Sequence, residues 1–90
     1  MQLINKLLDR IRWDREFGAA VFEIGYLDRL AGLIVKRPFV DLFFEPDNKE
    51  SFLLMDKEGM YQRIPLHRVR ELYRNGELIW QRPGTSDMIR

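Results

Sequence analysis

The sequence predicts an α+β fold, with one N-terminal helix packed on a mostly antiparallel sheet of about four to six short strands. Three features of the 90 residues support this prediction. An apolar stripe with helical spacing opens the chain, a segment of alternating apolar residues follows, and paired apolar runs joined by turn residues fill the second half. We expect one domain over residues 1–82 and a flexible C-terminal tail over residues 83–90.

The predicted helix covers about residues 2–12. Its apolar residues recur at helical spacing and form one stripe on its surface: Leu3, Ile4, Leu7, Leu8 and Ile11. From about residue 20 the period changes to two, which predicts a strand with one buried face. The residues on that face are Ala20, Phe22, Ile24 and Tyr26. Gly25, within the same strand, indicates a bulge or the close approach of another segment.

The middle of the chain combines strand and loop signals. Residues 33–35 are apolar, with two β-branched residues, and Pro38 favours an extended backbone just before it. Residues 39–44 are expected to form either a short strand or a packed loop. The polar sequence EPDNKE at residues 45–50 is rich in turn formers and predicts an exposed loop.

Two hairpins are predicted in the second half. The first joins residues 51–55 to residues 60–64 through the turn sequence DKEG. The second turns at the Asn-Gly pair of residues 75–76, because both positions accept positive φ. The alternative for residues 66–74 is a helix that begins near Pro65 and ends at the glycine of that pair.

The second hairpin needs a bulge to gather its apolar side chains. A bulge near Arg70 and Glu71 would turn His67 inward and place four residues in the core: Leu66, Val69, Leu72 and Ile79. Tyr73 would pair with Leu78. The opposite face would then carry Arg68, Tyr73 and Trp80. We favour this bulged hairpin over the helix.

Composition excludes several kinds of site. The chain has no cysteine and one histidine, which removes disulfides, thiolate metal sites and a Cys-His pair. P-loop, HExxH and GxSxG patterns are absent, as are the paired HxS/T motifs of 2H phosphoesterases. We therefore expect no catalytic residue, metal or cofactor. Apolar runs fall far short of the ~20 residues that span a membrane, and no signal-peptide pattern opens the chain, so we expect a cytoplasmic location without membrane contact.

The net charge of +1 hides an uneven distribution. Residues 63–82 carry five arginines and two glutamates, whereas residues 40–58 carry six acidic residues and two lysines. Such a dipole can steer an anionic ligand to one end of the molecule. It is too weak for a protein that coats long nucleic acids.

Four short pieces of the chain resemble a known family. They are RIRWD at residues 10–14, FEIGYLDR at 22–29, IPLHRVREL at 64–72 and NGELIWQR at 75–82. In order and spacing they resemble the RNA cyclic group end recognition domain, a small archaeal and bacterial family formerly described as a domain of unknown function. The resemblance implies an α+β domain that recognises RNA ends, including 2′,3′-cyclic phosphate ends, beside RNA-processing enzymes such as 2H phosphoesterases.

The same resemblance implies a set of site residues. The residues expected to bind RNA or phosphate are Arg12, Arg29, His67, Arg68 and Arg82. Those expected to stack on a base or ribose are Trp13, Tyr26 and Trp80. Asp28 is expected to orient an arginine. These roles suit the ligand, because a guanidinium can bind both free oxygens of a cyclic phosphate and bases stack on aromatic rings.

Each of these residues also has a structural alternative. In a small core a tryptophan packs more often than it binds a base, and a histidine in this position can bond to a carbonyl. Asp28 and Arg29 can cap or pair across a turn. Arg68 can lie on a solvated strand face with Arg70 and Arg74.

The function predicted from the sequence is non-catalytic binding of RNA ends. One alternative is a protein-interaction or scaffold module that docks a partner on Phe39, Val40, Phe43 and Phe44. The other is a phosphodiesterase in which Asp28 and His67 act as an acid-base pair on the cyclic phosphate.

Overall fold

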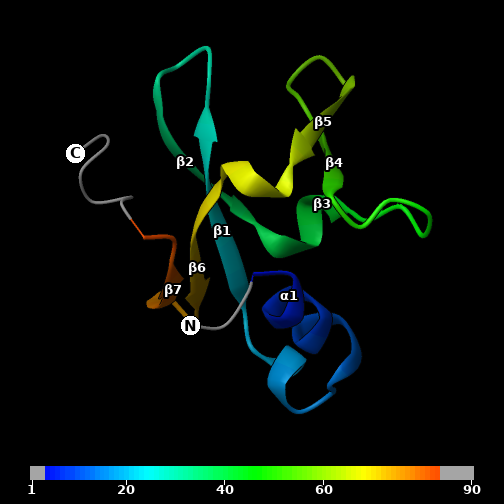
Figure 1. Ribbon diagram of the computed structural model, residues 1–90, viewed down its shortest axis with the longest axis vertical. Coiled ribbons are helices and arrows are strands. Elements are labelled where there is room, and N and C mark those ends of the chain that lie inside the picture. Colours follow the sequence, from blue (N-terminus) through cyan, green and yellow to red (C-terminus); the bar gives the residue numbers. More distant parts are fainter. Residues whose placement is uncertain (1–3, 84–90) are drawn as a thin grey trace.

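The computed structural model describes residues 4–83, and within them the chain forms one α-helix and seven strands in two antiparallel sheets (Figure 1). Helix α1 is Ile4–Trp13. The four-stranded sheet has the order β2-β1-β6-β7, formed by Leu33–Pro38, Phe22–Asp28, Val69–Arg74 and Glu77–Gln81. The three-stranded sheet has the order β3-β4-β5, formed by Leu42–Phe43, Ser51–Met55 and Tyr61–Pro65. The α+β class and the N-terminal helix are confirmed, with the strands divided between two sheets.

Helix α1 buries the apolar stripe that the sequence predicts, through Ile4, Leu7, Leu8 and Ile11. It ends at Trp13, and the Asp14 carboxylate then accepts hydrogen bonds from the backbone N–H groups of Glu16 and Phe17, each at 3.1 Å. These bonds turn the chain into the short 3₁₀ helix η1, Phe17–Ala19. The expected helix start at residue 2 and most of the expected tail lie outside the described residues.

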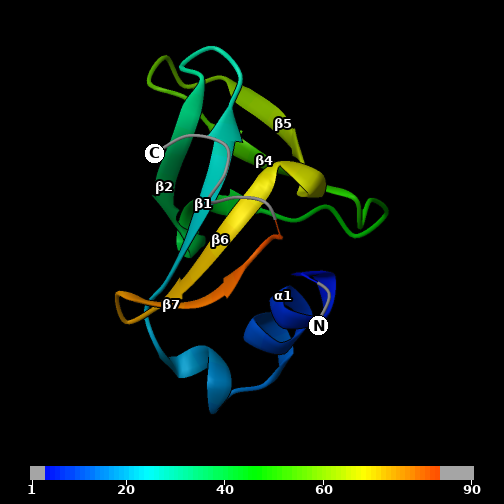
Figure 2. The same ribbon diagram turned by 60° about the vertical axis from the view of Figure 1, so that its left-hand side comes forward.

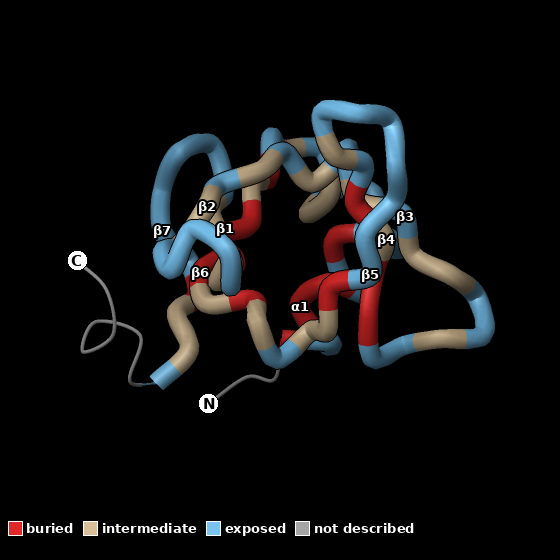
Figure 3. The backbone as a smooth tube through the Cα atoms, turned by 90° about the horizontal axis from the view of Figure 1, so that it is seen from above, coloured by how far each residue is buried: buried red, intermediate tan, exposed pale blue. Residues whose placement is uncertain are grey.

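The core lies between the two sheets (Figure 3). In this view the four-stranded and three-stranded sheets lie on opposite sides, and segments of buried residues lie along their facing sides. Helix α1 lies at the opposite end of the molecule from the β1–β2 turn (Figures 1 and 2). The core side chains are those of Ile4, Leu7, Leu8, Ile11, Phe22, Ile24, Tyr26, Phe52, Leu54, Ile64, Val69, Leu72 and Trp80.

The central strand β1 carries the irregularity predicted at Gly25. Gly25 pairs with Glu71 and Tyr26 pairs with Val69, so Arg70 is an extra residue in β6. A Cβ atom on Gly25 would lie 2.8 Å from the Glu71 Oε1 atom, which shows how closely β6 approaches. Strand β6 thus bulges at Arg70 as predicted, but against β1 and not against β7, and the bulge returns Val69 to the core.

The β6–β7 hairpin is confirmed and the helical alternative is wrong. Asn75 and Gly76 have φ values of 51° and 83°, as the two-residue turn requires. Tyr73 pairs with Leu78 as predicted, but Leu72 pairs with Trp80. Strand β7 therefore has its own bulge at residue 79.

This second bulge corrects two predicted positions. Ile79 was expected in the core but is 38% exposed, whereas Trp80 was expected on the outer face but is only 9% exposed. A shift of one residue moves a strand's side chains to the opposite face. The bulge thus buries the larger indole in place of the isoleucine, and the indole excludes more apolar area from water.

The chain crosses between the sheets twice, and it uses the same backbone both times. Pro38 leads into the 3₁₀ helix η2, Phe39–Asp41, and Pro65 leads into η3, Leu66–Arg68. The two prolines have nearly equal dihedral angles, with φ of −61° and −64° and ψ of 139° and 143°. His67 lies in η3 and not in a strand, so the expectation that it points inward is wrong: its side chain is exposed.

No helix within residues 4–83 has the length and apolar character needed to cross a membrane.

Candidate functional site

The nine predicted site residues divide between two concave regions and the core. Four of them line the hollow between the end of β1, strand β5 and η3: Tyr26, Asp28, Arg29 and Arg68. We call this region, which Leu30, Gln62 and Ile64 complete, the β1–β5 hollow. Four others line a groove beside helix α1: Arg12, Trp13, His67 and Arg82. Trp80 packs in the core and offers little surface for stacking.

Arg68 is the most unusual member of the β1–β5 hollow. It is the last residue of η3 and is half-buried, and its Nε atom is inaccessible without a hydrogen-bond acceptor in the described part of the chain. Arg70 also has a buried Nε atom without an acceptor there, but it does not line the hollow. Buried polar atoms without hydrogen-bond partners are costly, so they often mark sites that a ligand or a water molecule completes.

Arg29 supplies a second cation to this hollow. Its side chain is exposed, and no acidic side chain among residues 4–83 forms an ion pair with it. The hollow has a volume of about 290 Å³. Two guanidinium groups around a space of this size favour a small anion with several oxygen atoms.

Asp28 acts on this site through the backbone. Its Oδ1 atom accepts hydrogen bonds from the N–H groups of Leu30 at 2.9 Å and Ala31 at 3.1 Å. Its backbone carbonyl accepts from the N–H of Gly32 at 2.8 Å. The carboxylate therefore closes the β1–β2 turn and determines where the Arg29 backbone leaves the sheet.

Tyr26 contributes a hydroxyl group that stays protonated at neutral pH. Burial raises the pKa of Tyr26 above its ordinary value, and the negative charge of Asp28 raises it further, while Arg37 opposes the shift. A neutral phenol can donate a hydrogen bond to an oxygen of a ligand in the hollow.

Arg82 holds η3 in place. Its Nε atom donates to the carbonyl oxygen of Val69 at 2.9 Å, and its Nη2 atom donates to that of Leu66 at 3.2 Å. Burial lowers the pKa of the Arg82 guanidinium, and the nearby charge of Arg70 lowers it further. Arg82 thus joins the end of β7 to the segment that presents His67 and Arg68.

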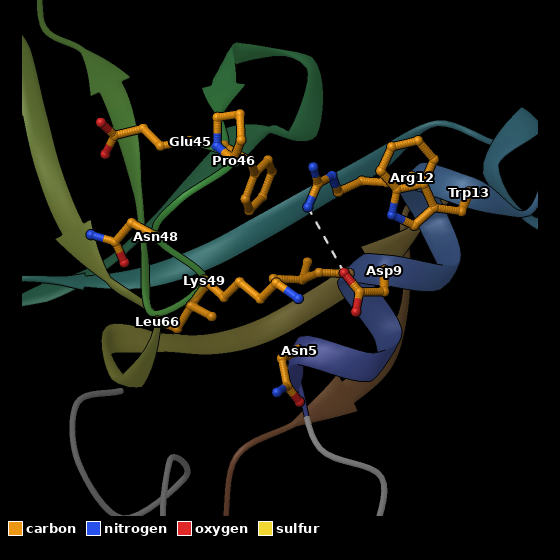
Figure 4. A pocket seen from close by; sticks show the side chains of 11 residues that line it. Asn5, Asp9, Arg12, Trp13, Glu45, Pro46, Asn48, Lys49 and Leu66 are labelled. Carbon is orange, nitrogen blue, oxygen red and sulfur yellow. Dashed lines mark ion pairs between the residues drawn. The ribbon is translucent and has the colours of Figure 1, made fainter.

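The groove beside α1 consists of two adjoining cavities, of about 370 and 520 Å³. Both are lined by Asn5, Lys49 and Leu66, so they lie next to each other. The first lies between α1 and the loop after β3 (Figure 4), and the second extends to His67 and Arg82. We call the whole region the α1 groove.

In the α1 groove, Arg12 connects the helix to the loop. Its guanidinium carbon lies 5.2 Å from the ring centroid of Trp13 and 4.9 Å from that of Phe44. It also forms an ion pair with Asp9 at 3.8 Å (Figure 4). These contacts hold Arg12 across the mouth of the groove.

Sequence reasoning missed the loop residues of this groove. Asn48 and Lys49 come from the segment to which no site was assigned, and Phe44 was expected on a different surface. No local pattern identifies them, because only the folded chain brings this loop beside α1.

The four residues suggested for partner docking do not form one exposed surface. Phe39 and Phe44 pack against the core, with their ring centroids 5.5 Å apart. Val40 and Phe43 are exposed. Among the described residues, no group of three or more His, Cys, Asp or Glu side chains is placed to hold a metal ion.

Comparison with known proteins identifies one family. A family model described as the MJ1316 RNA cyclic group end recognition domain matches residues 1–82. No solved structure matches the chain.

Proposed function

Because the chain belongs to the family of the MJ1316 RNA cyclic group end recognition domain, we propose that it binds the ends of RNA chains without cleaving them. The terminal phosphate, including a 2′,3′-cyclic phosphate, occupies the β1–β5 hollow. The observation that carries this assignment is the buried Nε atom of Arg68, which has no acceptor among the described residues and lies in a hollow shared with Arg29.

The chemistry of a cyclic phosphate suits this hollow. The group is a monoanion with two free oxygens, and a planar guanidinium can donate to both. Arg68 is the proposed partner of those oxygens, with Arg29 adding charge from the β1–β2 turn. The Tyr26 hydroxyl and the Gln62 amide are available to the ribose. At about 290 Å³ the hollow is close to the lower limit of small-molecule sites, roughly 300 Å³, which suits a ribose phosphate better than a whole nucleotide.

The proposed function does not include cleavage of the cyclic phosphate. Asp28 and His67, the acid-base pair considered above, line different concave regions. The Asp28 carboxylate is also held by two backbone N–H groups. A general base must lie within hydrogen-bond reach of the proton that it removes, so this arrangement gives the pair no common substrate atom.

The proposed function also implies the kind of protein partner and the cellular location. A domain that holds an RNA end without processing it acts beside an enzyme that makes or consumes that end. RNA-processing enzymes are therefore the expected protein partners, and the cytoplasm is the expected place of action.

The test compares two RNA oligonucleotides of one sequence, one ending in a 2′,3′-cyclic phosphate and one in a 3′-hydroxyl, by fluorescence anisotropy. We expect the cyclic end to bind at least about tenfold more tightly, because it adds charge-assisted hydrogen bonds. Arg68→Ala should remove this preference. Arg15→Ala is the matched control, since Arg15 is exposed and lines neither concave region. Equal affinity of the unmodified protein for both ends would overturn the proposal.

A further inference from the structure

Trp13 is exposed to an unusual degree for a tryptophan. It ends helix α1, and 75% of its surface is accessible, whereas Trp80 is 9% exposed. Tryptophan is buried in most folded proteins, and its ring carries a large apolar area. An indole left in water beside a groove therefore offers an accessible ring face on which a flat ligand can stack.

The position of the indole is restrained by its neighbours. Arg12 stands over the Trp13 ring at 5.2 Å and over the Phe44 ring at 4.9 Å, while Asp9 pairs with the same guanidinium at 3.8 Å. Cation–π contacts and an ion pair thus order the arginine between the two rings. The result is a flat, partly preorganised surface at one end of the α1 groove.

Amide groups line the groove next to this surface. The Asn48 Oδ1 atom accepts a hydrogen bond from the Glu50 N–H at 3.0 Å, which leaves the amide nitrogen to donate. Asn5 adds a second side-chain amide from the helix (Figure 4). Amides carry both donors and acceptors, as the edges of nucleobases do.

The charge of the groove argues for a base and against a second phosphate. Three cationic side chains line it, Arg12, Lys49 and Arg82. Three carboxylates oppose them, Asp9, Glu45 and Glu50, and Glu45 is also paired with Arg63 outside the groove. The net charge of the groove is therefore small, and the groove gives an anion only a weak net attraction. It still accepts an uncharged aromatic group.

From these observations we propose that the α1 groove is a nucleobase-binding subsite for single-stranded RNA, in which one base stacks on Trp13 and the amides of Asn5 and Asn48 bind polar groups of the RNA farther along the groove. This inference rests on the proposed function, because it assumes that the bound chain is RNA. The subsite is separate from the β1–β5 hollow, since Arg68 lines the hollow and His67 lines the groove on the other side of η3. RNA held at its end in the hollow would place an earlier nucleotide in the groove.

Ligands of two lengths test the subsite. A nucleoside 2′,3′-cyclic monophosphate can occupy only one of the two regions, whereas a short oligonucleotide with the same end can reach both. Trp13→Ala should weaken oligonucleotide binding about tenfold, as the loss of one stacked base does, and leave the affinity for the mononucleotide unchanged. Trp13 is mostly exposed, so its removal should not disturb folding.

Tryptophan emission provides an independent readout. Oligonucleotide binding should quench the emission of the unmodified protein, and Trp13→Phe should abolish the quenching while retaining most of the affinity. Tyr61→Ala is the control, because it removes an exposed aromatic ring that lines neither region.

The outcomes separate this inference from the proposed function. If Trp13→Ala binds the oligonucleotide as tightly as the unmodified protein does, the proposed base-binding subsite is overturned. The proposed function can still hold in that case, provided that Arg68→Ala has lost the preference for the cyclic end. If cyclic and hydroxyl ends bind equally but both quench Trp13, the subsite stands and end recognition fails. Absence of RNA binding by the unmodified protein overturns both.

Discussion

The corners η2 and η3 have the same backbone and opposite side-chain chemistry. Each follows a proline at the end of a strand, and in each the N–H of the next residue donates to the first carbonyl of the 3₁₀ helix. At η2 the last residue is Asp41, which pairs with Arg37 at 3.3 Å. At η3 the last residue is Arg68, and no carboxylate in the described chain pairs with it.

This difference separates what the corner does for the fold from what it does for the site. The shared backbone takes the chain from one sheet to the other. At η2 the charge of Asp41 is neutralised by the ion pair with Arg37. Corner η3 performs the same task with an unneutralised cation and is held by Arg82 through two carbonyl groups. The proposed binding function therefore depends on side chains that the corner itself does not require.

Exchanging the charges of the two corners should have the largest effect. Arg68→Asp gives η3 the acidic residue of η2, and we expect binding of cyclic-phosphate RNA to fall at least about a hundredfold, because a like charge then faces the phosphate. The reciprocal change, Asp41→Arg, should leave the affinity within about twofold, since Asp41 does not line the β1–β5 hollow. Anisotropy titrations measure both. Strong binding by Arg68→Asp would show that the phosphate lies elsewhere.

Removing the Arg82 hydrogen bonds that hold η3 should have an intermediate effect. Arg82→Met removes two charge-assisted hydrogen bonds to the Leu66 and Val69 carbonyls, and we expect the free energy of unfolding to fall by about 1–3 kcal/mol. Urea unfolding followed by circular dichroism measures this loss. The control is Arg15→Met, which removes an exposed arginine and should change stability by less than about 0.5 kcal/mol. Equal stability of the two variants would mean that the Arg82 hydrogen bonds to η3 do not stabilise the fold.

Breaking the ion pair of η2 should have the smallest effect. Asp41→Asn removes a partly exposed pair, which typically contributes about 0.2–1 kcal/mol, and RNA affinity should not change. Thermal unfolding at low and high salt checks the first part, because any contribution of the pair should shrink as salt increases. A loss of RNA binding in this variant would show that the two corners are not functionally distinct.

Local sequence patterns predicted most of the secondary structure for identifiable reasons. The helical stripe of α1, the alternation in β1 and the Asn-Gly turn each depend on residues close together in the sequence. The sequence alone therefore predicts them. The bulge at Arg70 was also predictable, because without it Val69 would face solvent. The bulge in β7 was not, because it depends on whether the core accepts the indole of Trp80 or the side chain of Ile79.

The candidate site was less predictable than the fold. Family resemblance named nine residues, and the fold brings Tyr26, Asp28, Arg29 and Arg68 into one hollow. Sequence reasoning could not separate His67 from Arg68, since both lie in one short motif and η3 alone places them in different regions. It also gave no role to Lys49, whose position beside α1 depends on the path of a long loop.

By itself, the sequence determined the class of fold, the positions of the turns and the absence of thiol chemistry, because these follow from composition and from contacts between near neighbours. Only the tertiary structure decided which tryptophan is buried, which carboxylates are already paired and which arginine with a buried, unpaired Nε atom lines the β1–β5 hollow. Those properties depend on side chains far apart in the chain. Their burial and pairing arise only when the two sheets close on each other and α1 covers one end.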